Sequence, residues 1–491
     1  MTPSLLVRGG RLGLGGPRSD VLLAQGRVAA IAPAGTLDAD APTLQLADAT
    51  VLPGLVDGHV HVEQWARRAR RVDVAGTRRA EEVVERVRRR LTAAPPRPGR
   101  VVFAHGFVDG LWPSPAHKDL LDAAFGDLPV AAVSGDLHCA WLNTAALAVV
   151  GHAGHPTGVL RERDAMDAVV RLDAATPVAE LDSWVGEALA TLTPRGVTGL
   201  IDFEFADNLT AWRRRSRAGA PPVRIHAALW APWLDAALDA GLRTGEELPG
   251  TGGRVHVGPY KVVADGSLNT RTAWCCDPYP TMPESAGLCL VEPEDLVVQM
   301  KRAWAGGLEP AVHAIGDRAN QMVLDAFEQV GCPGRIEHAQ LVRDADLPRF
   351  ARRGLVTSVQ PQHATADRDV ADRHWAGWTH RAFAYRSLHD AGATLALGSD
   401  APVSPLDPWL AIADAVHRTD DGRAPWHPEQ SLPLEAALTA AAGGRREVSV
   451  GSLADLTVVA GDPREYDAVE LRSPRVLATV VGGHCTHRAD F

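Results

Sequence analysis

Short apolar segments alternate with helical segments through residues 53–444. The apolar segments are rich in Val, Ile and Leu, and the stretches between them are rich in Ala, Leu, Arg and Glu. Strand–helix alternation of this kind predicts a parallel α/β architecture. The predicted strands are Val51–Val56, Val101–Ala104, Val130–Ser134, Gly199–Phe203, Val223–Leu229, Val257–Val263, Pro310–Ala314, Arg335–Glu337, Leu355–Val359 and Leu395–Gly398.

Ten strands are more than the eight of a (β/α)8 barrel. We therefore assign Val101–Ala104 and Val130–Ser134 to an insertion at about residues 100–150, after the first barrel strand. Brief β-like runs broken by Gly and Pro occupy residues 1–52 and residues 445–491. Because chain termini often lie close together, we expect these two ends to pair as one small β-sandwich.

Composition excludes several function classes. The formal net charge of −10 argues against a nucleic-acid-binding protein, which needs a basic face to neutralise phosphates. Runs of arginine occur, but glutamates interleave with them at helical spacing, as on an ion-paired and solvated helix face. The chain lacks an apolar run long enough to cross a membrane. The six cysteines form no Cys-x-x-Cys pair, so we expect free thiols and a cytoplasmic protein.

Histidines and one aspartate stand at the ends of predicted strands. His59 and His61 are two residues apart in extended chain, so both side chains point to the same face. His313, His338 and Asp400 each stand at or just after another short apolar run. Barrel enzymes place their chemistry at the carboxyl ends of the strands, and imidazole and carboxylate groups suit a divalent metal such as zinc.

Lys261 lies inside an apolar strand, in a chain whose 50 basic residues include three lysines only. A buried amine loses its proton more easily, and it can then react with carbon dioxide to give a carbamate that bridges two metal ions. Arginine does not replace it readily in this role. The alternative is a lysine that extends along the strand to reach solvent. The neighbouring metal-competent residues favour the bridging interpretation.

An ordered set of motifs resembles the amidohydrolase superfamily, within it the YtcJ-like group (amidohydrolase family 3), which includes N-substituted formamide deformylases. The resemblance covers nearly the whole chain. It is carried by the segments that begin at Leu52 (LPGLVDGHVH), Gly135 (GDLHCAWLN), Lys261 (KVVADGSL), His313 (HAIGD), Glu337 (EHAQ), Ser358 (SVQPQH), Gly398 (GSDAPV) and Gly451 (GSLADL).

The resemblance implies a (β/α)8 barrel with a β-sandwich built from both chain ends, and one or two zinc ions per chain. By motif match, His59 and His61 would bind the more buried metal, and a carboxylated Lys261 would bridge. His313 and His338 would hold the second metal, and Asp400 would bind the first.

These residue types predict hydrolysis of an amide-type C–N bond, as in an N-acyl or N-formyl amine. Metal-bound hydroxide would attack the carbonyl, and Asp400 would pass the water's proton to the leaving amine. His105, His138 and His363 are candidate donors to the developing oxyanion, although a structural hydrogen bond explains each of them equally well. Asp265 would either orient a ligand or cap a turn.

Six tryptophans near the motif-bearing loops favour a small-molecule substrate with an apolar or aromatic group. They are Trp65, Trp112, Trp141, Trp274, Trp375 and Trp378. The expected partners are this substrate and a second copy of the chain in a homodimer, with neither nucleic acid nor membrane. Three alternatives stay open: a cyclic amide, carbamate or ester hydrolase on the same site; a non-catalytic binding protein on the same scaffold; and histidines that merely fill the barrel mouth.

Overall fold

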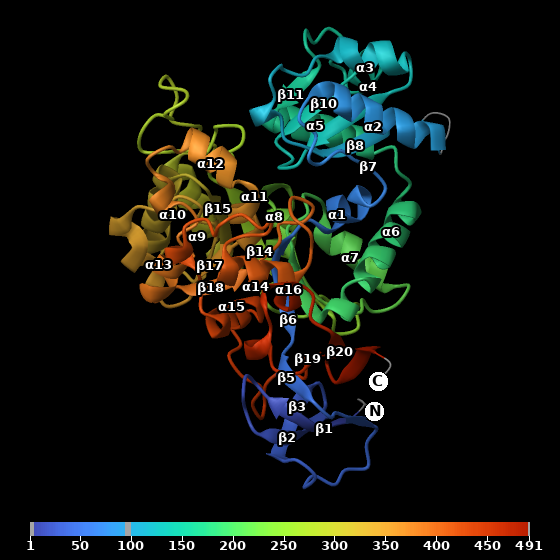
Figure 1. Ribbon diagram of the computed structural model, residues 1–491, viewed down its shortest axis with the longest axis vertical. Coiled ribbons are helices and arrows are strands. Elements are labelled where there is room, and N and C mark those ends of the chain that lie inside the picture. The colour runs from blue at the N-terminus through green and yellow to red at the C-terminus, as the bar shows by residue number, and fades with distance from the viewer. Residues whose placement is uncertain (1–3, 94–99, 490–491) are drawn as a thin grey trace.

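The computed structural model describes residues 4–93 and 100–489, and its strands form three sheets (Figure 1). The central sheet has eight parallel strands in the order β18-β17-β16-β15-β14-β13-β12-β6. A parallel bridge between Val60 and Ala401 brings its two edges together, so the barrel is nearly closed. The strands are β6 (Leu55–Val60), β12 (Val197–Asp202), β13 (Arg224–Leu229), β14 (Val255–Val263), β15 (Pro310–Ala314), β16 (Gly334–His338), β17 (Leu355–Val359) and β18 (Thr394–Leu397).

Helices surround the barrel, and their apolar faces fix them to it. In α10, Ala319, Val323 and Phe327 recur at four-residue steps and are buried, and the helix ends at Gly331 in the left-handed conformation. Replacing Phe327 by Ala would cost about 3–5 kcal/mol. The helices outside the insertion are α1 (Val62–Arg68), α6 (Val178–Ala190), α7 (Asn208–Ser216), α8 (Ala231–Asp239), α9 (Pro293–Ala305), α10 (Asp317–Val330), α11 (Pro361–Ala366), α12 (Arg368–His374), α13 (Tyr385–Asp390), α14 (Pro408–His417), α15 (Leu434–Ala441) and α16 (Ala468–Arg472).

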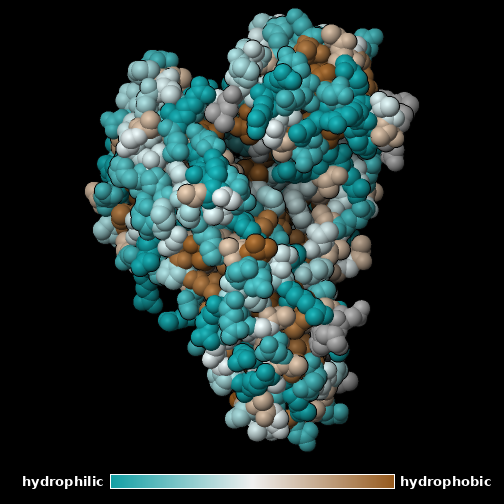
Figure 2. Space-filling model, in the orientation of Figure 1, coloured by the Kyte–Doolittle hydropathy of each residue, from teal (hydrophilic) through white to brown (hydrophobic). Residues whose placement is uncertain are grey.

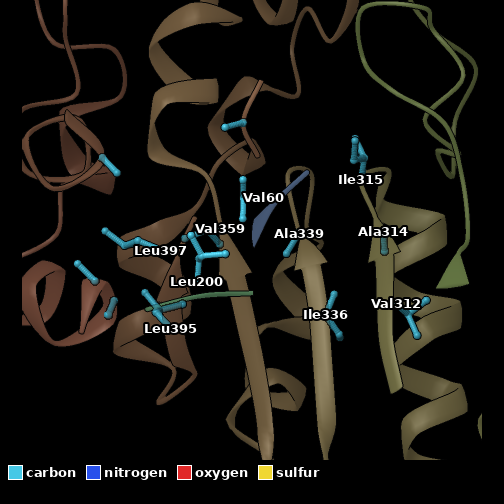
Figure 3. Packing of buried hydrophobic residues seen from close by; sticks show 14 of the residues in the cluster. Val60, Leu200, Val312, Ala314, Ile315, Ile336, Ala339, Val359, Leu395 and Leu397 are labelled. Atoms are coloured by element: carbon cyan, nitrogen blue, oxygen red, sulfur yellow. The ribbon is translucent and has the colours of Figure 1, made fainter. Parts of the chain in front are cut away.

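Barrel strands such as β15 and β16 are buried on both faces, which is why they read as continuous apolar runs. Figure 3 shows part of this packing, with Val312 of β15 beside Ile336 of β16, its partner in the parallel register. The predicted barrel with a terminal β-structure is confirmed. One predicted strand, Val51–Val56, is two strands in two different sheets.

The break falls at Gly54. Residues before it form β5 (Ala49–Pro53), which pairs antiparallel with β19 in the sheet of the chain ends, whereas β6 pairs parallel with β12. A Cβ atom at Gly54 would lie 2.3 Å from Thr198 Oγ1, so the chain can pass between the two sheets only with glycine here. Pro53 contributes no N–H to either ladder.

Both chain ends contribute to one sheet, in the order β21-β20-β19-β5-β1-β2-β3, with β4 beside β1. Its buried residues form a core of their own, which includes Val7, Leu23 and Val458. The strands are β1 (Leu5–Leu12), β2 (Arg18–Ala24), β3 (Arg27–Pro33), β4 (Thr43–Gln45), β5, β19 (Leu456–Ala460), β20 (Val476–Val481) and β21 (His484–Arg488).

A third sheet, in the order β11-β10-β9-β8-β7, lies between the first and second barrel strands in the sequence. It spans Val72–Arg161 and is therefore longer than the 100–150 range expected for the insertion. Glu82 and Glu85 on its helix α2 pair with arginines, as the charge pattern indicates. Its elements are β7 (Val72–Asp73), α2 (Ala80–Ala93), β8 (Val102–Phe107), α3 (Lys118–Phe125), β9 (Val130–Ser134), β10 (Cys139–Leu142), α4 (Thr144–Val149), β11 (Val159–Arg161) and α5 (Glu162–Asp173).

The division into residues 1–52, 53–444 and 445–491 stays a prediction.

Figure 2 shows a face of the molecule that is hollowed between the insertion and the barrel helices around α12. In the part of the chain described here, no helix is long and apolar enough to cross a membrane. All six cysteines are free.

Candidate metal centre

The strand ends bring the predicted ligands together at one end of the barrel. His59 lies in β6, and His61 follows it as the residue before α1. Lys261 lies in β14, His313 in β15, and His338 is the last residue of β16. Asp400 follows β18. Because these strands are parallel, their carboxyl ends share one edge, and residues far apart in the sequence meet there.

One group of potential ligands consists of His59, His61 and Asp400, whose ligand atoms all lie within 4.8 Å of one another. Asp400 Oδ1 is 3.6 Å from His59 Nε2 and 3.3 Å from His61 Nε2. Lys261 Nζ lies 3.4 Å from His59 Nε2 and 4.4 Å from the centre of the Phe203 ring. The lysine amine therefore points to this group from a buried strand, and not to solvent.

A second group consists of His338, His363 and Asp400, also within 4.8 Å of one another. His363 comes from α11, and its Nε2 lies 3.9 Å from Asp400 Oδ2. His313, expected from the resemblance in this position, lies with Nε2 3.3 Å from Asp265 Oδ1 and 3.4 Å from the Gly266 carbonyl. Its ring centre is still only 4.5 Å from that of His338.

The residues fit a divalent metal such as zinc. Imidazole nitrogens and a carboxylate are the ligands that zinc prefers, and Asp400 offers one oxygen to each group. The buried Nε2 of His363 and Nδ1 of His61 have no hydrogen-bond partner among the described residues. An imidazole nitrogen that is buried without a partner is costly, and a bound cation would satisfy His363 Nε2.

The protonation states also suit metal binding. Burial and the neighbouring Lys261 charge, opposed in part by Asp400 and Glu337, lower the pKa of His59 to about 4, so the ring is neutral near pH 7. Burial alone would raise the pKa of Asp400, but its electrostatic interactions with the His59, His61 and His338 rings, with a hydrogen bond from His61 among them, hold it well below its usual range. Burial lowers the pKa of Lys261 to about 8. Neutral imidazoles and an ionised carboxylate are the forms that ligate metals.

A set of polar contacts orients the histidine rings. His59 Nδ1 donates to Glu337 Oε2 at 2.8 Å, and Arg335 Nε donates to the other oxygen of that carboxylate at 2.7 Å. His338 Nδ1 donates to Gln360 Oε1 at 2.9 Å. Both contacts fix the tautomer that leaves Nε2 free for a metal. His338 and Asp400 also have φ values of 79° and 56°, strained for non-glycine residues and typical of functional sites.

The sequence predicts no role for Glu337, Arg335 or Gln360, although Glu337 and Gln360 stand within the motifs EHAQ and SVQPQH and Arg335 begins a predicted strand. A signal for the first two was present. Arg335 and Glu337 are two residues apart in an apolar strand, so their charged side chains share one face, where each needs a partner. For Gln360, which follows β17, there was no comparable signal.

A sequence model described as the Amidohydrolase family matches residues 43–487. The chain belongs to the amidohydrolase family. It is 28% identical to the putative amidohydrolase YtcJ of Bacillus subtilis (strain 168), over 90% of each chain. It is 26% identical to the N-substituted formamide deformylase of Arthrobacter pascens, over 98% of this chain and 94% of that one.

Solved structures agree on the fold. An uncharacterised metal-dependent hydrolase from Pyrococcus horikoshii OT3 superimposes with a TM-score of 0.80 at 24% identity, over 95% of this chain and 99% of that one. The amidohydrolase family and the ligand groups around Asp400 together support a metal-dependent hydrolase.

In this amidohydrolase, His138 of the insertion lies near enough to Asp400 for the two groups to interact electrostatically. Its Nδ1 donates to Glu162 Oε2 at 2.7 Å. Burial lowers the pKa of His138, but this hydrogen bond and the charges of Asp136, Glu162 and Asp400 raise it to about 9. Asp136 in turn accepts hydrogen bonds from Ser267 and Asn269, on the loop after β14, at 3.2 and 3.0 Å. These contacts tie the insertion to the barrel loop beside Lys261.

The remaining predicted residues have other surroundings. His105 of β8 lies beside Arg68 and Arg71, outside both ligand groups. Asp265 accepts backbone hydrogen bonds from Trp274, Ile315 and Gly316 and so fixes the loops around His313. Two of the six tryptophans expected in the pocket, Trp141 and Trp375, are fully buried in hydrophobic cores, because core packing accounts for their rings.

Proposed function

We propose that this amidohydrolase is a zinc-dependent hydrolase that cleaves the amide-type C–N bond of an N-acyl or N-formyl amine. The observation that carries the proposal is the pair of ligand groups that share Asp400 at the barrel mouth. The relative from Arthrobacter pascens, whose name describes removal of a formyl group from an N-substituted formamide, supports this choice of bond.

His59, His61 and Asp400 would hold one ion, and His338 and His363 the other, with Asp400 between them. Lys261, with its nitrogen 3.4 Å from His59 Nε2, would bridge as a carbamate. His313, next to His338, is the alternative to His363 that the resemblance favours. A divalent ion in this position supplies an activated water and polarises the substrate carbonyl.

The protein groups would carry the proton transfers. Asp400 is ionised and faces both ligand groups, so it can accept a proton from the attacking water and deliver it to the nitrogen of the leaving amine. His138 is protonated near pH 7, and its charge interacts with that of Asp400. It would donate a hydrogen bond to the carbonyl oxygen as negative charge develops there. Glu162 would keep the His138 ring oriented for this donation.

The test combines metal analysis with turnover. Zinc-loaded protein should release benzylamine from N-benzylformamide or N-acetylbenzylamine, and chelation should stop the release. In H61Q the zinc content should fall, whereas H226Q, which changes a partly buried histidine of the barrel outside the ligand groups, should keep it. Protein that binds no zinc, or that hydrolyses neither amide when loaded, would contradict the proposal.

A further inference from the structure

A cavity of about 340 Å³ lies where the end of α1 meets the strands β7 and β8 of the insertion. Its lining residues come from the barrel on one side and from the insertion on the other. They are Trp65, Arg68, Ala69, Arg71, Asp73 and His105. The function proposed above uses none of these residues.

Arg68 is the cation in this cavity that remains available to a ligand. Arg71 is engaged, because its Nη2 donates to Asp173 Oδ2 at 2.6 Å and its guanidinium lies over the Phe103 ring. Arg68 has no carboxylate within 4.0 Å in the described residues, and it donates to the Pro402 carbonyl. Partial burial without a counter-charge lowers its pKa, and Asp73 offsets this only in part. A partly buried arginine without a carboxylate partner favours binding of an anion.

His105 is the second polar group of this cavity, and the Pro402 carbonyl beside it also accepts a hydrogen bond from Arg68. The His105 side chain is 1% exposed, and neither ring nitrogen has a hydrogen-bond partner in the parts of the chain that the structure describes. Burial and the positive charges of Arg68 and Arg71 lower its pKa to about 3, and the Pro402 carbonyl opposes them in part. The neutral ring can donate one hydrogen bond, and an acceptor in the cavity would relieve the cost of burial.

The other two walls limit the kind of anion. Asp73 is exposed at the rim and accepts a hydrogen bond from the Ala75 backbone, so its negative charge opposes a ligand with two charges. Trp65 offers an indole ring to an apolar group. A carboxylate attached to an apolar or aromatic group therefore fits this lining better than a phosphate does.

The cavity is joined to the metal centre by short connections. The helix that carries Trp65 and Arg68 begins directly after His61, and the backbone N–H of Trp65 donates to the backbone carbonyl of His61. Arg68 contacts Pro402, two residues after Asp400. A ligand held by Arg68 would therefore lie beside the chain segments that carry His61 and Asp400.

We propose that this cavity binds a carboxylate attached to an apolar group, with Arg68 and His105 on the carboxylate and Trp65 on the apolar part. The ligand is part of the substrate only if the proposed function holds, and this step of the inference rests on it. The cavity then selects N-acyl or N-formyl amines that carry a carboxylate away from the scissile bond.

Calorimetry with phenylacetate tests the binding directly, on the zinc-loaded protein. Phenylacetate should bind, and 2-phenylethanol and inorganic phosphate should bind at least about tenfold more weakly. The R68M variant should weaken phenylacetate binding at least about tenfold. R70M is the matched control, because Arg70 is close by in sequence, exposed and paired with Glu187, and it should bind as the wild type does. Equal binding by R68M and the wild type, or tighter binding of phosphate, would overturn the proposal.

A substrate pair separates this proposal from the proposed function. N-formylphenylalanine and N-formylphenethylamine differ by one carboxylate. The wild type should have at least about tenfold higher kcat/KM for the first, and R68M should lose this preference. Hydrolysis of both at equal rates would overturn the carboxylate subsite and support the proposed function. Hydrolysis of neither, with Arg68-dependent binding of phenylacetate, would overturn the proposed function and support the cavity as a carboxylate site.

Discussion

Two pairs of histidines lie at opposite ends of the same barrel, the first buried and the second partly buried. At the carboxyl ends of the strands, His59 and His338 have ring centres 4.9 Å apart. Near the amino ends of β13 and β14, His226 and His256 stack with ring centres 5.2 Å apart. Burial lowers the pKa in both pairs, so all four rings are neutral near pH 7.

Their charged neighbours differ. Asp400 and Glu337 face the first pair and provide negative charge that favours a cation. The second pair lies beside Arg224, whose charge lowers the pKa of both histidines further. Asp455, the nearby carboxylate, is engaged by Arg224 at 2.6 Å. Neither His226 nor His256 belongs to a metal-binding group in the described residues. A pair of neutral histidines therefore does not by itself predict a metal site; the carboxylates beside the pair decide.

The largest effect is expected at Asp400, which both ligand groups share. D400N keeps the shape and removes the charge and the basicity, so turnover should fall by about a thousandfold or more. Zinc content should fall less than turnover, because His59, His61 and His338 remain. Steady-state kinetics of N-benzylformamide hydrolysis, with zinc measured on the same samples, tests this. Turnover within tenfold of the wild type would exclude Asp400 as the proton carrier.

Lys261 separates a site with two ions from a site with one. If it bridges as a carbamate, zinc should fall from about two ions per chain to about one in K261A. K261R is the informative second variant, because it keeps the positive charge and does not readily form a carbamate. It should lose zinc as K261A does. A zinc content unchanged in both variants would make Lys261 a bystander near His59.

The sequence pattern was sufficient for the fold and for most of the residues at the mouth. Strand–helix alternation located seven of the eight barrel strands and the first residues of β6, and the strand ends located His59, His338 and Asp400. The sequence pattern could not predict which side chains come close to one another across the barrel mouth, because those distances depend on loop conformation and on the orientation of the imidazole rings. His363, on a short helix after β17, shares a ligand group with His338, whereas His313 turns to Asp265.

The hydropathy pattern predicted one strand where the chain in fact passes from one sheet to another. Val51–Val56 is one apolar run, and nothing in its hydropathy indicates that the chain changes sheets at Gly54. The reason is tertiary: Thr198 packs against the glycine where a Cβ atom would lie. The pairing of Glu337 with His59, 278 positions apart, is likewise a product of the fold.

Glu337 tests how far the carboxylates at the mouth contribute beyond direct ligation. E337Q keeps an acceptor for His59 Nδ1 and removes the charge that faces it. Zinc affinity should fall about 10- to 100-fold, as for other changes in groups that orient metal-binding histidines. Excess zinc should then restore most of the turnover, which a change in the chemistry itself would not allow. Competition with a chelating dye measures the affinity, and unchanged affinity would count against the orienting role.

The smallest effect is expected at the other end of the barrel. Burial, His256 and Arg224 hold the pKa of His226 at about 4, below its ordinary value of 6.5. The unfolded chain therefore binds a proton between these values that the folded chain does not, and His226 costs stability as the pH falls from about 6.5 toward 4. Between pH 7.5 and pH 5 the loss should be on the order of 1–2 kcal/mol.

H226Q removes this titration and should reduce the loss of stability on acidification by that amount, while zinc content at neutral pH stays the same. Urea unfolding at pH 7.5 and at pH 5 measures the difference, and the same change at exposed His484 provides the control. Release of zinc at low pH affects the wild type and the variant equally, so it cancels in the comparison. An equal pH dependence in both proteins would mean that burial, His256 and Arg224 do not hold His226 neutral. The contrast between the two ends of the barrel would then rest on Asp400 and Glu337 alone.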